Sequence, residues 1–255
     1  MRHSPRLNAT YWMTLITGSI FGTNAGDFAA DNLHLGHLQG LPFLLMIFGA
    51  LLAAERALPQ SGALLFWGAI ITVRTAATNI GDSFRDFGIG FPVSVPLVLA
   101  LFAAGVVWSR VSSAGKTADR PIEVNASYWA CMTLAGVLGT LVGDVMSFVL
   151  GLGTLLAAAC QGVVVAVVLA AGITRGLGGT VPSRSNVAVL PLYWTTVALI
   201  RCAGTSAGDW LSHEAFGLEW STAITGLCFC VLVAHGYGRR VSQGDTGKLA
   251  AQASD

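Results

Sequence analysis

Charged side chains are scarce in this chain, and their scarcity excludes an ordinary water-soluble domain. Only 11% of the 255 residues are Asp, Glu, Lys or Arg, whereas 54% are hydrophobic. Soluble domains carry about 25% charged residues, which cover their water-facing surface. The formal net charge is only +1, so no basic field favours a nucleic-acid partner. The composition predicts a protein whose main partner is the lipid bilayer.

Cysteine patterns and catalytic motifs are also missing. The five cysteines lie inside apolar runs without zinc-site spacing, which favours buried free thiols over disulfides. The chain has no His-Glu-x-x-His motif and no phosphate-binding Gly-rich loop. We therefore expect no enzymatic activity and no cofactor, although the acidic residues described below would allow a bound metal cation.

Four copies of one motif run through the chain. In each copy an aromatic–Trp pair precedes a Gly-Asp pair, and the Trp lies 15 residues before the Asp. A Thr lies four residues before each Asp and follows a small residue. The signature aspartates are Asp27, Asp82, Asp144 and Asp209, the signature threonines are Thr23, Thr78, Thr140 and Thr205, and the aromatic pairs are Tyr11-Trp12, Phe66-Trp67, Tyr128-Trp129 and Tyr193-Trp194. The second and fourth copies also share an arginine, Arg74 and Arg201, which indicates a duplicated duplication.

Each motif lies on an apolar segment of membrane-crossing length, and a second such segment follows it. A helix needs about 20 residues to cross the hydrocarbon, and the cost of unpaired backbone in lipid excludes open strands. We predict helices at residues 10–33, 41–57, 64–86, 92–110, 126–149, 153–173, 191–212 and 218–237. The predicted fold is an all-α integral membrane protein with eight transmembrane helices in four tandem two-helix repeats, 8–58, 63–111, 125–175 and 190–237, followed by a polar cytoplasmic tail at 238–255.

The distribution of basic residues predicts the orientation. Eight spans place both termini on one side, which holds eleven Lys and Arg residues, whereas the other side holds only Arg85. The eleven are Arg2, Arg6, Arg56, Arg110, Lys116, Arg120, Arg175, Arg184, Arg239, Arg240 and Lys248. The positive-inside rule then places both termini in the cytoplasm. All four copies insert in the same direction, so pseudo-symmetry about the membrane normal follows, with the Trp residues at the inner interface and the aspartates in the outer third of the bilayer.

The signature threonines and aspartates share one face of their helices, because residues four apart form a stripe. If the four stripes converge, a ring of Asp lies above a ring of Thr. Carboxylates inside a membrane are costly and usually mark a pathway. Oxygen ligands favour hard cations, so the four aspartates are candidate metal ligands. In the structural alternative, the Gly-Asp pairs only pack helices and each carboxylate bonds to its neighbours.

The two intramembrane arginines have two interpretations. Arg74 and Arg201 could form a cationic layer that gates ions or binds an anion, or they could have a structural role, either snorkelling to the cytoplasmic interface or capping a broken helix. Asp31, His34 and His37 have metal-like spacing, but a single copy has it, and a solvated loop is the simpler interpretation. For Gln161 and His235 we expect interhelical hydrogen bonding and an interfacial location, respectively.

The four aromatic–Trp pairs, each followed by Thr-x-x-Gly-Asp, resemble the signature of a bacterial membrane-protein family. That family consists of four tandem two-span repeats of unknown function, each with a signature Trp. The resemblance covers residues 8 to 237 and implies a bacterial inner-membrane location, but no activity.

The leading hypothesis from the residues is a transporter or channel for a small ion, in particular a hard divalent cation, with proton coupling as an option. The rivals are a carrier of a small anion or polar solute that uses the two arginines, and a structural or accessory membrane protein. Substrate and oligomeric state stay open.

Overall fold

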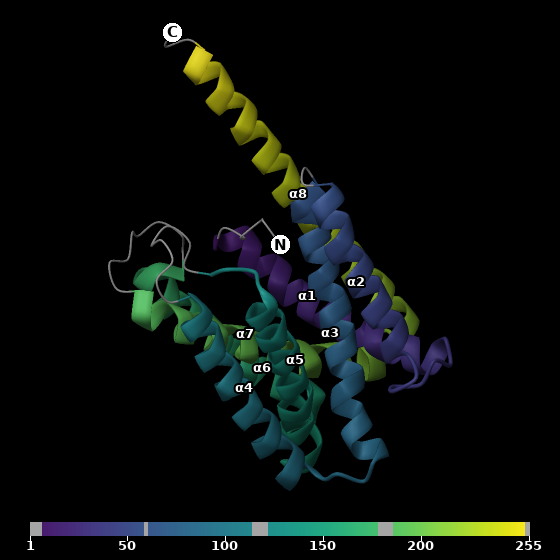
Figure 1. Cartoon of the computed structure of the whole chain (residues 1–255). Helices are drawn as coiled ribbons and strands as arrows, with labels where there is room; N and C mark the ends of the chain where they lie inside the picture. The colour runs from purple at the N-terminus through teal and green to yellow at the C-terminus, as the bar shows by residue number, and fades with distance from the viewer. Residues whose placement is uncertain (1–6, 59–60, 114–121, 178–185, 253–255) are drawn as a thin grey trace.

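The computed structural model describes residues 7–58, 61–113, 122–177 and 186–252, and the regular structure in these ranges is helical. The α-helices are α1 (Ala9–Asp27), α2 (Leu41–Ala57), α3 (Gly62–Asp86), α4 (Phe91–Ser113), α5 (Ala126–Asp144), α6 (Gly153–Gly172), α7 (Asn186–Asp209) and α8 (Leu218–Gln252). Helices therefore occur at all the predicted positions. The polar tail after residue 237 continues α8 up to Gln252, and this helix extends beyond the bundle (Figure 1). Arg2, Arg6, Lys116, Arg120 and Arg184, which we used to predict the orientation, lie outside the described residues.

The motif-bearing helices of the first and third copies begin in the same way. The Asn8 side chain accepts a hydrogen bond from the Tyr11 backbone N–H at 2.8 Å, and Asn125 accepts one from Tyr128 at 3.0 Å. An N-cap asparagine satisfies a backbone donor that has no partner inside the helix. The shared Asn-Ala-Thr/Ser-Tyr-Trp lead-in is thus a helix start.

The four motif-bearing helices form a closed ring. Helix α1 packs against α3, α3 against α5, α5 against α7, and α7 against α1. Each second helix then packs on the outside, against the first helix of the following copy: α2 on α3, α4 on α5, α6 on α7, and α8 on α1 (Figure 1). The contact pattern therefore repeats cyclically through all four copies.

The outer helices expose apolar side chains, whereas those of a soluble helix bundle would expose polar ones. Within the described ranges, five helices are long and apolar enough to cross a membrane: α3, α4, α5, α6 and α8. The apolar windows of the outer helices α4 and α6 are only 22% buried, whereas that of α5 is 61% buried. Large apolar side chains such as Leu45, Val111 and Leu227 lie more than half exposed on outer helices. Exposed apolar surface of this extent is typical of contact with lipid, so the chain has the features of a membrane protein.

The Gly-Asp pairs allow the inner helices to approach closely. A Cβ placed on Gly26 would lie 2.9 Å from Thr78 Cβ, and one on Gly143 would lie 2.9 Å from Thr205 Cβ. Gly81 faces Thr140 and Gly208 faces Thr23 in the same manner. In every copy, the signature glycine thus packs on the signature threonine of the next copy. Small residues at helix interfaces serve this purpose in membranes, so the packing part of the structural alternative is correct.

The aromatic pairs form a second closed ring. Tyr11 packs on Trp67, Phe66 on Trp129, Tyr128 on Trp194, and Tyr193 on Trp12, with ring centroids 5.5 to 6.0 Å apart. Three of the four Trp side chains are buried, and the indole N–H of Trp12 donates to the Leu177 carbonyl oxygen at 3.1 Å. These rings lie between helices, because each fits against the aromatic residue of a neighbouring copy. Their location at the inner membrane interface stays a prediction.

Candidate functional site

The signature threonines surround the guanidinium group of Arg74. The Nη2 atom donates to Thr23 Oγ1 at 2.5 Å and to Thr205 Oγ1 at 2.7 Å, and Nη1 donates to Thr140 Oγ1 at 3.2 Å. These acceptors come from the first, fourth and third copies, whereas Arg74 belongs to the second. The Arg74 side chain is fully buried. A single cationic group is therefore held inside the ring by threonines of the three other copies.

Backbone carbonyl groups complete the Arg74 site. Nη1 also donates to Gly136 O at 3.1 Å, and Nε donates to Ser19 O at 3.3 Å. Thr78 donates to the Arg74 carbonyl oxygen within its own helix at 3.4 Å. Of the two interpretations of Arg74, snorkelling is therefore wrong, because its donors find acceptors inside the ring. The signature threonines also differ from our expectation, since three of them accept from this side chain rather than lining an open path.

The signature aspartates lie one helical turn beyond the threonines. Asp82, Asp144 and Asp209 are at most 7% exposed, and Asp27 is partly buried. Electrostatic repulsion acts between Asp27 and both Asp82 and Asp209. It also acts between Asp144 and the same two carboxylates. Equivalent carboxylates from the four copies are thus close enough to interact electrostatically.

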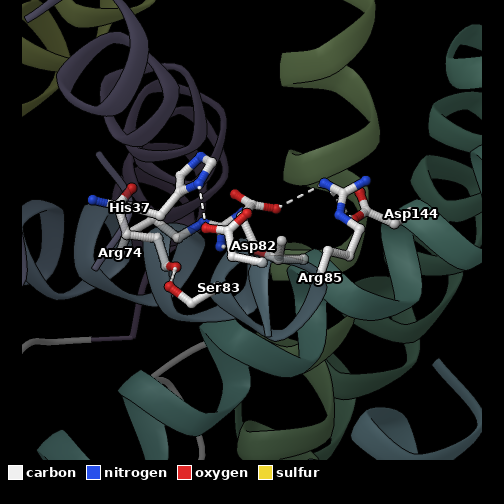
Figure 2. A network of polar contacts seen from close by, with 9 residues as sticks. His37, Arg74, Asp82, Ser83, Arg85 and Asp144 are labelled. Carbon is white, nitrogen blue, oxygen red and sulfur yellow. Dashed lines mark hydrogen bonds and ion pairs between the residues drawn. The ribbon is translucent and has the colours of Figure 1, made fainter. Parts of the chain in front are cut away.

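Arg85, which we did not select from the sequence, links two of these carboxylates. Its Nη2 atom lies 3.1 Å from Asp82 Oδ1 and 3.5 Å from Asp144 Oδ2 (Figure 2). The Arg85 side chain is half exposed, whereas both carboxylates are buried. Arg74, on the other side of the aspartate layer, interacts electrostatically with Asp27 and Asp209. The aspartates therefore lie between an outer and an inner arginine. The sequence signal was available, because among the described residues Arg85 is the one Lys or Arg at its end of the bundle.

Metal binding by the four aspartates remains a prediction. Among the described residues, no three His, Cys, Asp or Glu side chains come close enough together to hold a metal ion. Two of the four carboxylates, Asp82 and Asp144, pair with Arg85.

Three of the four aspartates stand at a change in helix geometry. The π-helical turns η1 (Phe28–Asn32), η3 (Val145–Val149) and η5 (Trp210–Ala215) begin directly after Asp27, Asp144 and Asp209. Such turns inside α-helices occur frequently at functional sites. In the second copy α3 continues as an α-helix to Asp86, and this is the copy that carries Arg85.

Arg201 and three signature tyrosines lie together at the other end of the ring. Arg201 is fully buried, and among the described residues its guanidinium group makes one hydrogen bond, from Nη2 to Met132 Sδ at 3.8 Å. The hydroxyl of Tyr193 lies 2.6 Å from that of Tyr11 and 3.3 Å from that of Tyr128. Arg201 interacts electrostatically with all three phenols. Snorkelling is therefore wrong for Arg201 as well.

The remaining polar candidates lie away from the ring interior. His37 pairs with Asp86 at 3.2 Å rather than with Asp31 or His34. Gln161 accepts a hydrogen bond from Ser206 of α7 at 3.2 Å, which confirms the expected interhelical bonding, and His235 is exposed.

Two further sequence features are explained by the helices. Residues 204–208 have a Gly-x-Ser-x-Gly spacing, but they lie within α7 rather than in the strand-to-helix turn that this catalytic motif needs. The five cysteines are free, yet only Cys131 and Cys202 are buried, because Cys160, Cys228 and Cys230 face outward.

The helices of membrane-spanning length, together with a polar interior built from repeated motifs, define a repeat-containing membrane protein. The chain belongs to the family described as Repeat of Unknown Function (DUF347), whose model matches residues 10–58, 127–176 and 192–242. The second copy, at 63–111, lies outside the matched ranges, so its assignment depends on its motif and packing. Searches of curated proteins and of solved structures found no match.

Proposed function

We propose that this protein is an eight-span transporter of a small ion in the bacterial inner membrane, with both termini in the cytoplasm. Helices α1, α2 and α7 would cross the membrane beside the five helices of sufficient apolar length. Helix α2 is apolar but has only 17 residues, and α1 and α7 carry polar side chains that face the ring interior. The cyclic packing supports a pseudo-symmetry axis along the membrane normal.

The observation that carries the proposal is the position of the Arg74 guanidinium. It lies among Thr23, Thr140 and Thr205, where a cation on the axis would find oxygen ligands from several copies. A built-in cation at this position closes the path in the resting state. The signature aspartates beyond it are the outer binding layer, where a proton or a small cation is captured.

Electrostatic interactions couple the capture of a cation or proton to the opening of the path at Arg74. The aspartates stabilise Arg74 and Arg85 electrostatically where they lie. When a proton or cation neutralises that layer, this stabilisation weakens and Arg74 is freed to leave the threonines. Proton coupling follows naturally, because buried clustered carboxylates can exchange protons near neutral pH.

Transport by purified protein in liposomes tests the proposal. Flux of monovalent and divalent cations is measured with a pH gradient, for the wild type, Asp144→Asn and Asp209→Asn. We expect the wild type to move at least one cation above protein-free liposomes, and each substitution to reduce the rate at least tenfold. Glu219→Gln, which changes an exposed acidic residue of α8, is the matched control and should keep the rate.

Two results would reject the cation proposal. Wild-type flux at the level of empty liposomes for every ion would favour a structural or accessory role. Unchanged flux in both aspartate variants would favour a path that does not use the signature aspartates. The rival anion carrier that employs both arginines is disfavoured by the five hydrogen bonds of Arg74, which leave that side chain few free donors.

A further inference from the structure

The two buried arginines differ sharply in how their donors are satisfied. A guanidinium group carries five N–H donors. Those of Arg74 make five hydrogen bonds to oxygen atoms, whereas Nε and Nη1 of Arg201 have no partner. The one contact of Arg201, to the sulfur of Met132, uses a weak acceptor. Arg201 therefore has unused donors at a position with no access to solvent.

Arg201 also lacks a negative partner. Among the described residues, the ion pairs do not include Arg201; the phenols of Tyr11, Tyr128 and Tyr193 attract it, and the guanidinium of Arg74 repels it. A buried charge without a counter-charge is strongly unfavourable. Arg74, in contrast, interacts electrostatically with two carboxylates, those of Asp27 and Asp209.

The tyrosine cluster contributes both donors and acceptors. Three hydroxyl groups joined by two hydrogen bonds use two of their three protons, so one O–H remains free to donate. In the second copy the equivalent position is Phe66, whose side chain has no polar atom. The phenol oxygens keep acceptor lone pairs, yet among the described residues none accepts a hydrogen bond from Arg201.

We propose that Arg201 and the hydroxyl groups of Tyr11, Tyr128 and Tyr193 bind a small monovalent inorganic anion of halide size. Such an anion accepts from several N–H and O–H donors at once and neutralises the buried guanidinium. This site lies at the opposite end of the ring from the aspartate layer, and its existence does not depend on cation transport.

Bromide binding to the purified protein in detergent tests the site. Bromide is titrated against gluconate at constant ionic strength and pH, and the midpoint of thermal unfolding is recorded. We expect a saturable rise of the midpoint with bromide in the wild type, and a crystal grown in bromide should show anomalous scattering beside Arg201. Tyr193→Phe removes a donor while keeping the ring, and we expect its apparent bromide affinity to fall about tenfold.

Two arginine variants distinguish the site from general salt effects. Arg201→Gln should lose the bromide response, whereas Arg110→Gln, which changes an exposed arginine of α4, should keep it. An equal response in bromide and gluconate, or a full bromide response in both Arg201→Gln and Tyr193→Phe, would overturn the proposal. A water molecule rather than bromide beside Arg201 would also overturn it. Because these readouts measure binding, they remain informative if no cation flux is found.

Discussion

Replacing Gly143 by alanine tests whether the signature glycines hold the ring together. The added Cβ would lie 2.9 Å from both Cβ and Cγ2 of Thr205, so α5 and α7 must separate by about 0.5 Å to reach ordinary contact at 3.4 Å. Overpacking of this kind costs about 1–3 kcal/mol. The higher helix propensity of alanine returns up to about 1 kcal/mol. We expect a net loss of about 1–2 kcal/mol in the free energy of unfolding.

The measurement is denaturant unfolding of purified protein in mixed micelles. Gly162→Ala is the matched control, because α6 has open space at that position and the substitution should be neutral or slightly stabilising. Adding Thr205→Ser to Gly143→Ala removes Cγ2 but keeps the hydroxyl that accepts from Arg74, so the double variant should recover part of the loss. Equal stability of Gly143→Ala and Gly162→Ala would refute the packing argument.

Three further predictions concern single side chains. Asn79 is fully buried and neither polar atom of its amide has a partner, so Asn79→Leu should raise the free energy of unfolding by about 1–3 kcal/mol, as denaturant unfolding would report. Arg85→Gln removes the outer partner of Asp82 and Asp144, and it should increase several-fold the labelling of these carboxyl groups by a carbodiimide, measured by mass spectrometry. A lipid-soluble maleimide should label outward-facing Cys160 but not buried Cys202 in the folded protein.

The helices and their repeat were predictable from the sequence because both depend on local patterns. Apolar segments of suitable length, interrupted by polar turns, mark each helix. The constant spacing between Trp and Asp marks each copy. The glycine before each aspartate and the small residue before each threonine also indicate close helix packing, and the structure assigns each of them to a neighbour in the next copy.

The polar interior could be predicted only in outline. Helical spacing places the threonines and aspartates on one stripe, but it does not say which long side chain from another copy reaches them. Arg74 crosses the ring to three other helices, a choice that depends on its length and on the glycines that bring those helices close. The sequence predicted the tyrosines only as neighbours of the Trp residues. The cluster of their hydroxyl groups could not be predicted, because it depends on how the N-terminal ends of three different helices pack together.

Cation leak through the Arg74→Ala variant tests most directly the claim that this guanidinium closes the axis. The variant is purified as a monodisperse folded protein, reconstituted in liposomes and compared with the wild type and with Arg85→Ala. We expect downhill cation flux in Arg74→Ala that exceeds the flux of both other proteins by several-fold and that falls when Asp209→Asn is added. Flux by folded Arg74→Ala no greater than that of protein-free liposomes would contradict it.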